Sequence, residues 1–230
     1  MDKAEILYED KALIVAVKPP GMPSQPDRSL AMDMVSFLKN HLAKTAKGKG
    51  EPYLAVVHRL DRPVGGVMVY AKTKEAAAAL SAQIQKGTMQ KSYQAVLTGV
   101  LTPKAGTLTD YLVKTRDGNF SEVCTAKTPG AKKAELKYKV IRTRYEDGVQ
   151  YALVDIDLLT GRHHQIRVQM AHAGAPLYGD TRYNPAFKDK AGWSDLALFA
   201  YKLTFTHPVT KKVMTFEAKP GDAITAHFQK

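Results

Sequence analysis

The sequence has a single cysteine, Cys124, and lacks any long apolar segment. One thiol excludes an intrachain disulfide and a cysteine-based zinc site of the usual kind. No apolar run approaches the roughly 20 residues that a membrane-spanning helix needs. The N-terminal residues, Met1-Asp2-Lys3-Ala4-Glu5, lack the basic segment and following apolar stretch of a secretory signal. We therefore expect a soluble, cytoplasmic protein with no membrane contact.

Acidic residues are scarce relative to basic ones. The chain has 22 Asp and Glu against 34 Lys and Arg, which gives a net charge of +12 and an isoelectric point near 9.6. A surplus of this size favours a polyanionic partner such as nucleic acid. Because the basic residues are spread along the chain and not gathered in a tail, we expect them to form a charged face on the folded protein. The alternative is a basic, soluble protein without a nucleic-acid role.

Apolar periodicity predicts more strands than helices. The pattern indicates helices over 29–43, 74–86 and 163–173, and an irregular segment over 120–133. Glu146-Asp147-Gly148 is typical of a hairpin turn. The predicted strands cover 6–10, 13–17, 53–57, 67–71, 92–97, 107–113, 134–141, 151–158, 196–206 and 213–217. Many neighbours are joined by short turns, which favours an α+β fold with a mixed, mainly antiparallel sheet. We expect one domain over residues 1–230.

The strongest candidate site is the loop His58-Arg59-Leu60-Asp61-Arg62-Pro63-Val64-Gly65-Gly66 between two apolar strands. Asp61 lies between Arg59 and Arg62, and a nearby cation keeps a carboxylate ionised. An ionised carboxylate at the end of a sheet can act as a nucleophile or a base. The alternative is an ordinary Asp–Arg ion pair in a turn, and the residues alone favour that alternative.

A second candidate runs from Leu158 to Gln169. Thr160-Gly161 ends a strand and opens a predicted helix, whose N-terminal amides can hold an anion beside Arg162 and Arg167. A solvated basic helix face is an equal alternative. His163, His164 and His172 do not indicate a metal site, because adjacent histidines on a helix diverge and no acidic cluster joins them. Tyr93, within Lys91-Ser92-Tyr93-Gln94-Ala95, is by itself typical of strand packing.

Taken together, these segments resemble the RluA family of RNA pseudouridine synthases over nearly the whole chain. His58-Arg59-Leu60-Asp61, with a glycine five residues after the aspartate, resembles that family's catalytic motif. The other matching segments are Tyr8-Glu9-Asp10, Val17-Lys18-Pro19-Pro20-Gly21, Lys91-Ser92-Tyr93-Gln94-Ala95, Thr160-Gly161-Arg162-His163-His164-Gln165-Ile166-Arg167-Val168, Pro176-Leu177-Tyr178-Gly179-Asp180, Ala197-Leu198-Phe199-Ala200-Tyr201-Lys202-Leu203 and Phe205-Thr206-His207-Pro208. Gly65, His163, Gln169 and Phe199 depart from residues common in the family, and these departures bear on the substrate more than on the reaction.

The resemblance implies a catalytic domain of the pseudouridine synthase type, with flanking helices, a central RNA-binding cleft and no separate N-terminal RNA-binding domain. It implies isomerisation of specific uridines in structured ribosomal or transfer RNA, with no cofactor, no metal and no obligatory protein partner, by a monomer. Asp61 would be the nucleophile at the anomeric carbon or the base at the 2′ position. Arg167, rather than Arg162, would pair with Asp61, and Tyr93 would stack on the flipped base and help to move the C5 proton. RNA contacts would come from Arg59, which enters the space left by the base, and from Arg62, Arg162 and His58.

Two other functions use parts of the same pattern. A non-catalytic RNA-binding or RNA-chaperone protein would share the charge but would not need Asp61. A phosphoesterase would need metal-binding carboxylates, for which Asp155, Asp157 and Asp180 are a thin set.

Overall fold

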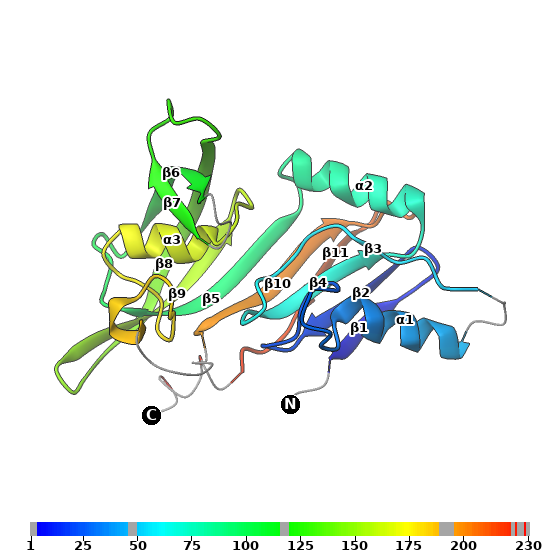
Figure 1. Ribbon diagram of the computed structural model, residues 1–230, viewed down its shortest axis with the longest axis horizontal. Helices are drawn as coiled ribbons and strands as arrows, with labels where there is room; N and C mark the ends of the chain where they lie inside the picture. The colour runs from blue at the N-terminus through cyan, green and yellow to red at the C-terminus, as the bar shows by residue number, and fades with distance from the viewer. Residues whose placement is uncertain are drawn as a thin grey trace. The chain divides into compact units, whose positions relative to one another are not determined.

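The computed structural model describes residues 4–45, 50–115, 120–188, 196–221, 224 and 228. The chain divides into two compact units (Figure 1). Unit 1 comprises Met1–Gln90 and Ala200–Lys219, and unit 2 comprises Lys91–Phe199 and Pro220–Lys230. Within the described ranges, no helix combines the length and the apolar character that crossing a membrane requires.

Unit 1 is built on a sheet with the strand order β1-β2-β4-β10, in which β11 also pairs with β10 and β3 with β4. The pairs β1–β2, β2–β4, β3–β4 and β10–β11 are antiparallel. The elements in chain order are β1 (Glu5–Glu9), β2 (Leu13–Lys18), α1 (Met34–Thr45), β3 (Ala55–Val56), β4 (Gly65–Ala71), α2 (Lys74–Gln85), β10 (Leu198–Thr206) and β11 (Val213–Glu217).

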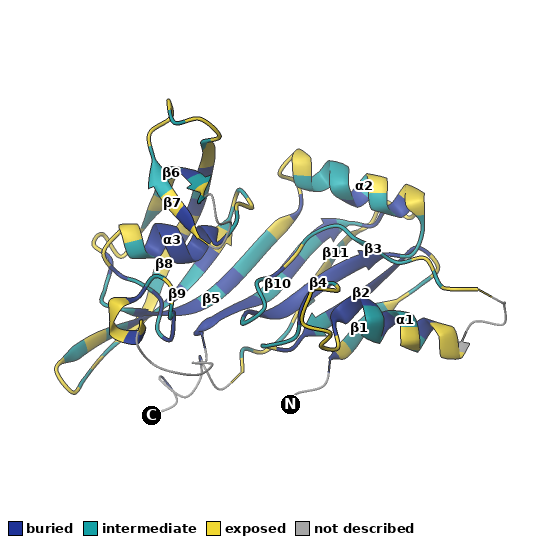
Figure 2. Cartoon of the chain, in the orientation of Figure 1, coloured by how far each residue is buried: buried dark blue, intermediate teal, exposed yellow. Residues whose placement is uncertain are grey.

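Helix α2 covers one face of this sheet. It starts at the N-cap Thr73, whose hydroxyl accepts a hydrogen bond from the amide of Ala76. Ala76 and Leu80 are buried among Leu13 and Val15 of β2, Val67, Val69 and Ala71 of β4, and Leu203 and Phe205 of β10. All seven residues of β4 are buried (Figure 2), so this strand is enclosed on both faces. Side chains alternate along a strand, so Lys18 of β2 points to the face opposite α2.

Unit 2 has the strand order β5-β9-β8-β6-β7. The pairs β5–β9, β9–β8, β8–β6 and β6–β7 are antiparallel. The elements are β5 (Gln90–Thr98), β6 (Ala105–Lys114), β7 (Ser121–Cys124), β8 (Lys132–Glu146), β9 (Val149–Leu158), α3 (Gln165–His172) and the short 3-10 helix η1 (Pro185–Phe187). Helix α3 packs on one face, where Val168 contacts Leu112 and Ala134.

The α+β class with a mixed, mainly antiparallel sheet is confirmed. The hairpin turn between β8 and β9 is confirmed as well, and Asp147 and Gly148 both have positive φ (50° and 79°). Several elements differ in extent from the prediction, among them β3, β6, β8 and β10. Strand β7 lies in the segment expected to be irregular. Helix α1 begins at Met34 rather than Ser29, because Asp33 Oδ1 accepts hydrogen bonds from the amides of Val35 and Ser36 and so caps the helix there. Helix α3 begins at Gln165.

Candidate active site

In unit 1, the loop that carries Asp61 joins β3 to β4 and is held on both sides of the aspartate. The amide of Val64 donates to the carbonyl of Asp61 at 3.0 Å, which closes a tight turn before Gly65. The hydroxyl of Ser24 donates to the carbonyl of Leu60 at 2.8 Å and accepts from the amide of Leu60 at 3.1 Å. The carbonyl of Arg62 accepts from the amide of Gly21 at 2.8 Å. The backbone on either side of the half-buried Asp61 is therefore fixed to residues 18–24.

A buried lysine lies under this loop. Lys18 is 0% exposed, and its Nζ donates to the carbonyls of Pro19, Met22 and Arg62 at 3.0, 2.7 and 3.0 Å. Burial lowers the pKa of Lys18 to about 7, while the negative charge of Asp61 acts in the opposite direction. Three carbonyl acceptors also match the three protons of an ammonium group. Lys18 thus ties the Asp61 loop to residues 19–22 and places a buried amine near the carboxylate.

Gly66 is the glycine five residues after Asp61, and the geometry explains why the position has no side chain. Its φ is +136°, and an added Cβ would lie 2.3 Å from the carbonyl oxygen and 2.6 Å from the amide nitrogen of Ala200. Any side chain at this position would collide with the backbone of β10 and displace β4, the strand that follows the Asp61 loop.

The other predicted RNA-binding residues of this loop differ in the hydrogen bonds and ion pairs that they form with the rest of the protein. His58 Nε2 accepts a hydrogen bond from the amide of Val69 at 3.1 Å, so that ring nitrogen has a structural partner. Arg62 donates through Nε to the carbonyl of Gly21 at 3.0 Å and lies 3.8 Å from Asp27. Arg59 is exposed and forms no hydrogen bond or ion pair with any residue in the described ranges.

In unit 2, Tyr93 lies on β5 and is 6% exposed. It faces Ile156 of β9 in the antiparallel register, and Ile156 faces Tyr138 of β8. Residues directly opposite in antiparallel strands share a face of the sheet, and Ala134 shares that face with Tyr138. Since Val168 packs on Ala134, Tyr93 is on the face that α3 covers.

Arg167 is a buried residue of α3, with 5% of its side chain exposed. Its Nε and Nη2 donate to Asp180 Oδ2 and Oδ1 at 2.8 and 2.7 Å, and the Asp180 side chain is 0% exposed. The Oδ1 atom also accepts from the amides of Arg182 and Tyr183. The guanidinium carbon of Arg167 lies 5.2 Å from the centre of the Tyr183 ring. A planar cation is therefore fixed by a two-point ion pair and an aromatic face.

The histidines before α3 are arranged differently from our expectation. His163 and His164 do not diverge: their rings stack with centroids 3.7 Å apart, because both precede the helix and His164 is a left-handed N-cap with φ of 52°. His163 Nδ1 lies 2.9 Å from Ser121 Oγ, and His164 Nδ1 lies 2.8 Å from the Tyr183 hydroxyl. Burial, followed by the charge of Arg167, lowers the pKa of His164 to about 2, so its ring is neutral near pH 7.

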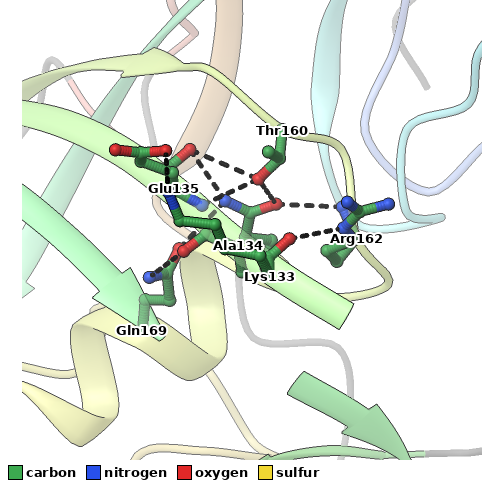
Figure 3. A network of polar contacts seen from close by, with 7 residues as sticks. Lys133, Ala134, Glu135, Thr160, Arg162 and Gln169 are labelled. Atoms are coloured by element: carbon green, nitrogen blue, oxygen red, sulfur yellow. Dashed lines mark hydrogen bonds and ion pairs between the residues drawn. The ribbon is translucent and has the colours of Figure 1, made fainter. Parts of the chain in front are cut away.

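A polar network fixes the chain between β9 and α3 (Figure 3). Gln165 is its centre: Oε1 accepts from the Thr160 hydroxyl at 2.8 Å and the Arg162 amide at 2.9 Å. The Gln165 Nε2 atom donates to the carbonyl of Glu135 and to Gln169 Oε1. Arg162 is exposed, and its Nε donates to the carbonyl of Lys133 at 2.8 Å. The helix thus begins four residues after Gly161, and Gln165 binds the Arg162 amide that we expected to be open to an anion.

Comparison with known proteins identifies the family. The family described as RNA pseudouridylate synthase matches residues 12–172, a range that contains Asp61, Tyr93 and Arg167. The chain belongs to the RNA pseudouridylate synthase family. This confirms the resemblance that the motifs indicated.

Curated relatives agree with this assignment. An uncharacterized RNA pseudouridine synthase of Bacillus subtilis, YhcT, is 33% identical over 224 residues, which cover 95% of this chain and 69% of the relative. Ribosomal large subunit pseudouridine synthase C of Vibrio vulnificus is 32% identical, with 95% and 66% covered. The tRNA pseudouridine synthase C of Pasteurella multocida is 32% identical, with 92% and 89% covered.

Among solved structures, human RNA Pseudouridylate Synthase Domain Containing 4 matches with a TM-score of 0.77. It is 23% identical, and the match covers 98% of this chain and 92% of that one. This likeness confirms the fold of the pseudouridine synthase domain.

Sequence reasoning missed three residues that support the predicted site of this pseudouridine synthase. Lys18 was present in a matching motif but had no assigned role, Asp180 was considered only as a phosphoesterase carboxylate, and Tyr183 was not singled out. A lysine at the end of an apolar strand, just before two prolines, was the available signal for Lys18. The pairing of Asp180 with Arg167 has no comparable local signal, because it joins residues on a helix and a later loop.

The carboxylates considered for a phosphoesterase have other roles. Asp155 accepts from Gln94 Nε2 at 2.9 Å, and Asp157 accepts from the Ser92 hydroxyl at 2.7 Å. Both lie on the sheet face opposite Tyr93, whereas Asp180 is paired with Arg167. In the part of the chain that the structure describes, no group of three or more His, Cys, Asp or Glu side chains is arranged to hold a metal ion.

Proposed function

We propose that this enzyme converts specific uridines of ribosomal or transfer RNA to pseudouridine. The bond between N1 of uracil and C1′ of ribose breaks, the base turns, and C5 bonds to C1′. The proton lost from C5 is balanced by the proton gained at N1, so the reaction is an isomerisation that needs no external group. The Vibrio relative is named for ribosomal RNA and the Pasteurella relative for transfer RNA, which supports both RNA classes as substrates.

The observation that carries the proposal is the placement of Asp61 within the matched family region. Its carboxylate is half-buried, and hydrogen bonds to Leu60 and Arg62 fix the backbone on either side. Fixed geometry is what a group needs if it attacks C1′ or removes the 2′ proton, because a small displacement of a reacting atom costs much of the rate. Asp61 is therefore our candidate for the essential carboxylate, in one of these two roles.

We assign supporting roles to two residues of unit 2. Arg167 is the cation that keeps Asp61 ionised, as the family resemblance implies, and its two-point pairing with Asp180 supports this role by fixing the plane of the guanidinium group. Tyr93 stacks on the uracil and helps to move the C5 proton, and its position on the α3-covered face is consistent with that role.

RNA contacts complete the proposal. Arg59 enters the space that the flipped base leaves. Its side chain suits this task because it is exposed and forms no hydrogen bond or ion pair with the described residues. Arg62, Arg162 and His58 also bind the RNA, and their hydrogen bonds to the protein orient them. As part of the same proposal, the enzyme acts as a monomer in the cytoplasm without an obligatory protein partner.

The test is Asp61→Asn, which keeps the side-chain volume and removes the charge. Pseudouridine formed in unmodified large-subunit ribosomal RNA and transfer RNA transcripts is mapped by sequencing. We expect the rate to fall by more than about 100-fold, the low end of what a positioned acid–base group contributes. RNA affinity and the melting temperature should stay close to those of the wild type.

Asp157→Asn is the matched control, since it makes the same change on an exposed strand position of the opposite face. It should keep full activity. An Asp61→Asn enzyme within tenfold of the wild-type rate would remove Asp61 from the chemistry.

A further inference from the structure

Lys91, at the start of β5, is a cation to which the proposed chemistry gives no role. Its side chain is half-buried, and burial lowers its pKa. No carboxylate or other hydrogen-bond acceptor is paired with its ammonium group among residues 4–45, 50–115, 120–188 and 196–221. A cation that is partly removed from water without an anion destabilises the fold. A bound anion would offset that penalty.

The strand register places Lys91 on the same side of the sheet as the predicted catalytic tyrosine. Lys91 and Tyr93 are two residues apart on β5, so both point to the face that α3 covers. Their Cα atoms are about 6.6 Å apart at the usual rise of a strand. This spacing fits the distance from a nucleoside to the phosphate beside it.

The ammonium group of Lys91 lies against Gly161. A Cβ at position 161 would be 3.3 Å from Lys91 Nζ and would meet no other atom within 4 Å. The next residue is Arg162, whose Nε is bound to the carbonyl of Lys133 and whose amide is bound to Gln165 (Figure 3). A guanidinium group has five N–H donors, so Arg162 can still bind a phosphate while it is held in this way.

We propose that Lys91, which lies against Gly161, and the adjacent Arg162 form a subsite for a backbone phosphate of the RNA strand that carries the reacting uridine. The identity of the RNA rests on the proposed function, whereas the subsite rests on the position of the Lys91 ammonium and on its lack of an acceptor among the described residues. The absence of a side chain at Gly161 lets the nucleic-acid backbone approach closely. Since phosphates carry no sequence information, the subsite holds the strand in place and leaves the choice of uridine to other contacts.

The experiment compares the binding of a short single-stranded oligouridylate by wild-type protein and Lys91→Met over a range of salt concentrations. Methionine keeps the apolar stem and removes the charge. We expect several-fold weaker binding at low salt, and a log–log salt slope that is smaller in magnitude by about 0.7, the value for one phosphate contact on a single strand. Lys91→Arg should keep the wild-type slope.

Two further variants test whether the effect of Lys91→Met comes from the subsite or from the loss of any positive charge. Lys139→Met removes an exposed cation from the opposite face of the same sheet, where Lys139 faces Asp155, and it should leave the slope unchanged. Gly161→Ala keeps every charge but crowds the ammonium, and it should weaken binding. Thermal unfolding of each variant checks that the fold is intact.

The outcomes distinguish this subsite from the proposed reaction. A Lys91→Met slope equal to that of the wild type would overturn the subsite, even if the wild type forms pseudouridine. If the slope falls as expected but the wild type forms no pseudouridine in any transcript, the subsite stands and the proposed function fails. Absence of oligouridylate binding by the wild type would overturn the subsite as well.

Discussion

The buried Lys18 makes the stability of unit 1 depend on pH in a window where most lysines have no effect. Burial lowers its pKa to about 7 in the folded protein, against about 10.4 in an unfolded chain. Between these values the unfolded state binds more protons than the folded state. The free energy of unfolding should therefore rise with pH in this window. The contribution of Lys18 is fully present above the unfolded pKa and is lost as the pH falls to the folded pKa.

The size of the effect follows from the two pKa values. From about pH 7.5 to about pH 9.5, the gain in unfolding free energy from this one group is up to about 2 kcal/mol. The three carbonyl acceptors favour the ammonium form, so they reduce the slope and make this figure an upper bound.

Urea unfolding of the wild type and Lys18→Met at both ends of the window measures this contribution. Other lysines and tyrosines also titrate near the upper end, so the quantity of interest is the difference between the two profiles. Lys11→Met, which removes an exposed lysine of the same unit, is the control and should follow the wild type. Parallel profiles for the wild type and Lys18→Met would refute the reasoning. They would mean that the three carbonyl acceptors fully offset the effect of burial on the pKa of Lys18.

Two further predictions concern residues that fix the predicted catalytic groups. Gly66→Ala should lower the unfolding free energy by more than about 2 kcal/mol, since it adds overpacking to backbone strain. Gly148→Ala, with φ of 79° and no atom within 4 Å of the added Cβ, should show the strain alone, and equal losses in urea unfolding would contradict the collision with Ala200. Asp180→Asn should destabilise the protein by about 3–5 kcal/mol, because it leaves Arg167 buried without its counter-charge. A change in melting temperature no larger than that of the exposed Asp157→Asn would contradict this account.

Elements whose formation depends on local sequence were predicted well. Strand β4 is a continuous apolar run, and the Asp147-Gly148 turn needs two residues that tolerate positive φ. Strand β7 was missed because its four residues, Ser121–Cys124, are short, mixed in polarity and only partly buried. Its position is set by pairing with β6, which no local pattern reveals.

Helix α3 shows why the surroundings of the site were harder to predict than its motifs. Periodicity placed only Ile166, Met170 and Ala173 on a buried face, yet residues 165–170 are all buried and Ala173 is exposed. Gln165 and Gln169 are buried because their amides bond to each other and to β8, and Arg167 is buried because Asp180 neutralises it. Such burial depends on partners that are distant in sequence, so a pattern of apolar residues cannot indicate it.

The charges assigned to catalysis each have a compensating charge in their own unit. Asp61 interacts with Lys18, and Arg167 is bound in two places by Asp180. An uncompensated buried charge is strongly destabilising, so the buried Arg167 depends on Asp180 for its place in unit 2. Lys91 has no role in the proposed chemistry and no counter-charge among the described residues, and this is the reason that we assign a phosphate of the substrate to it.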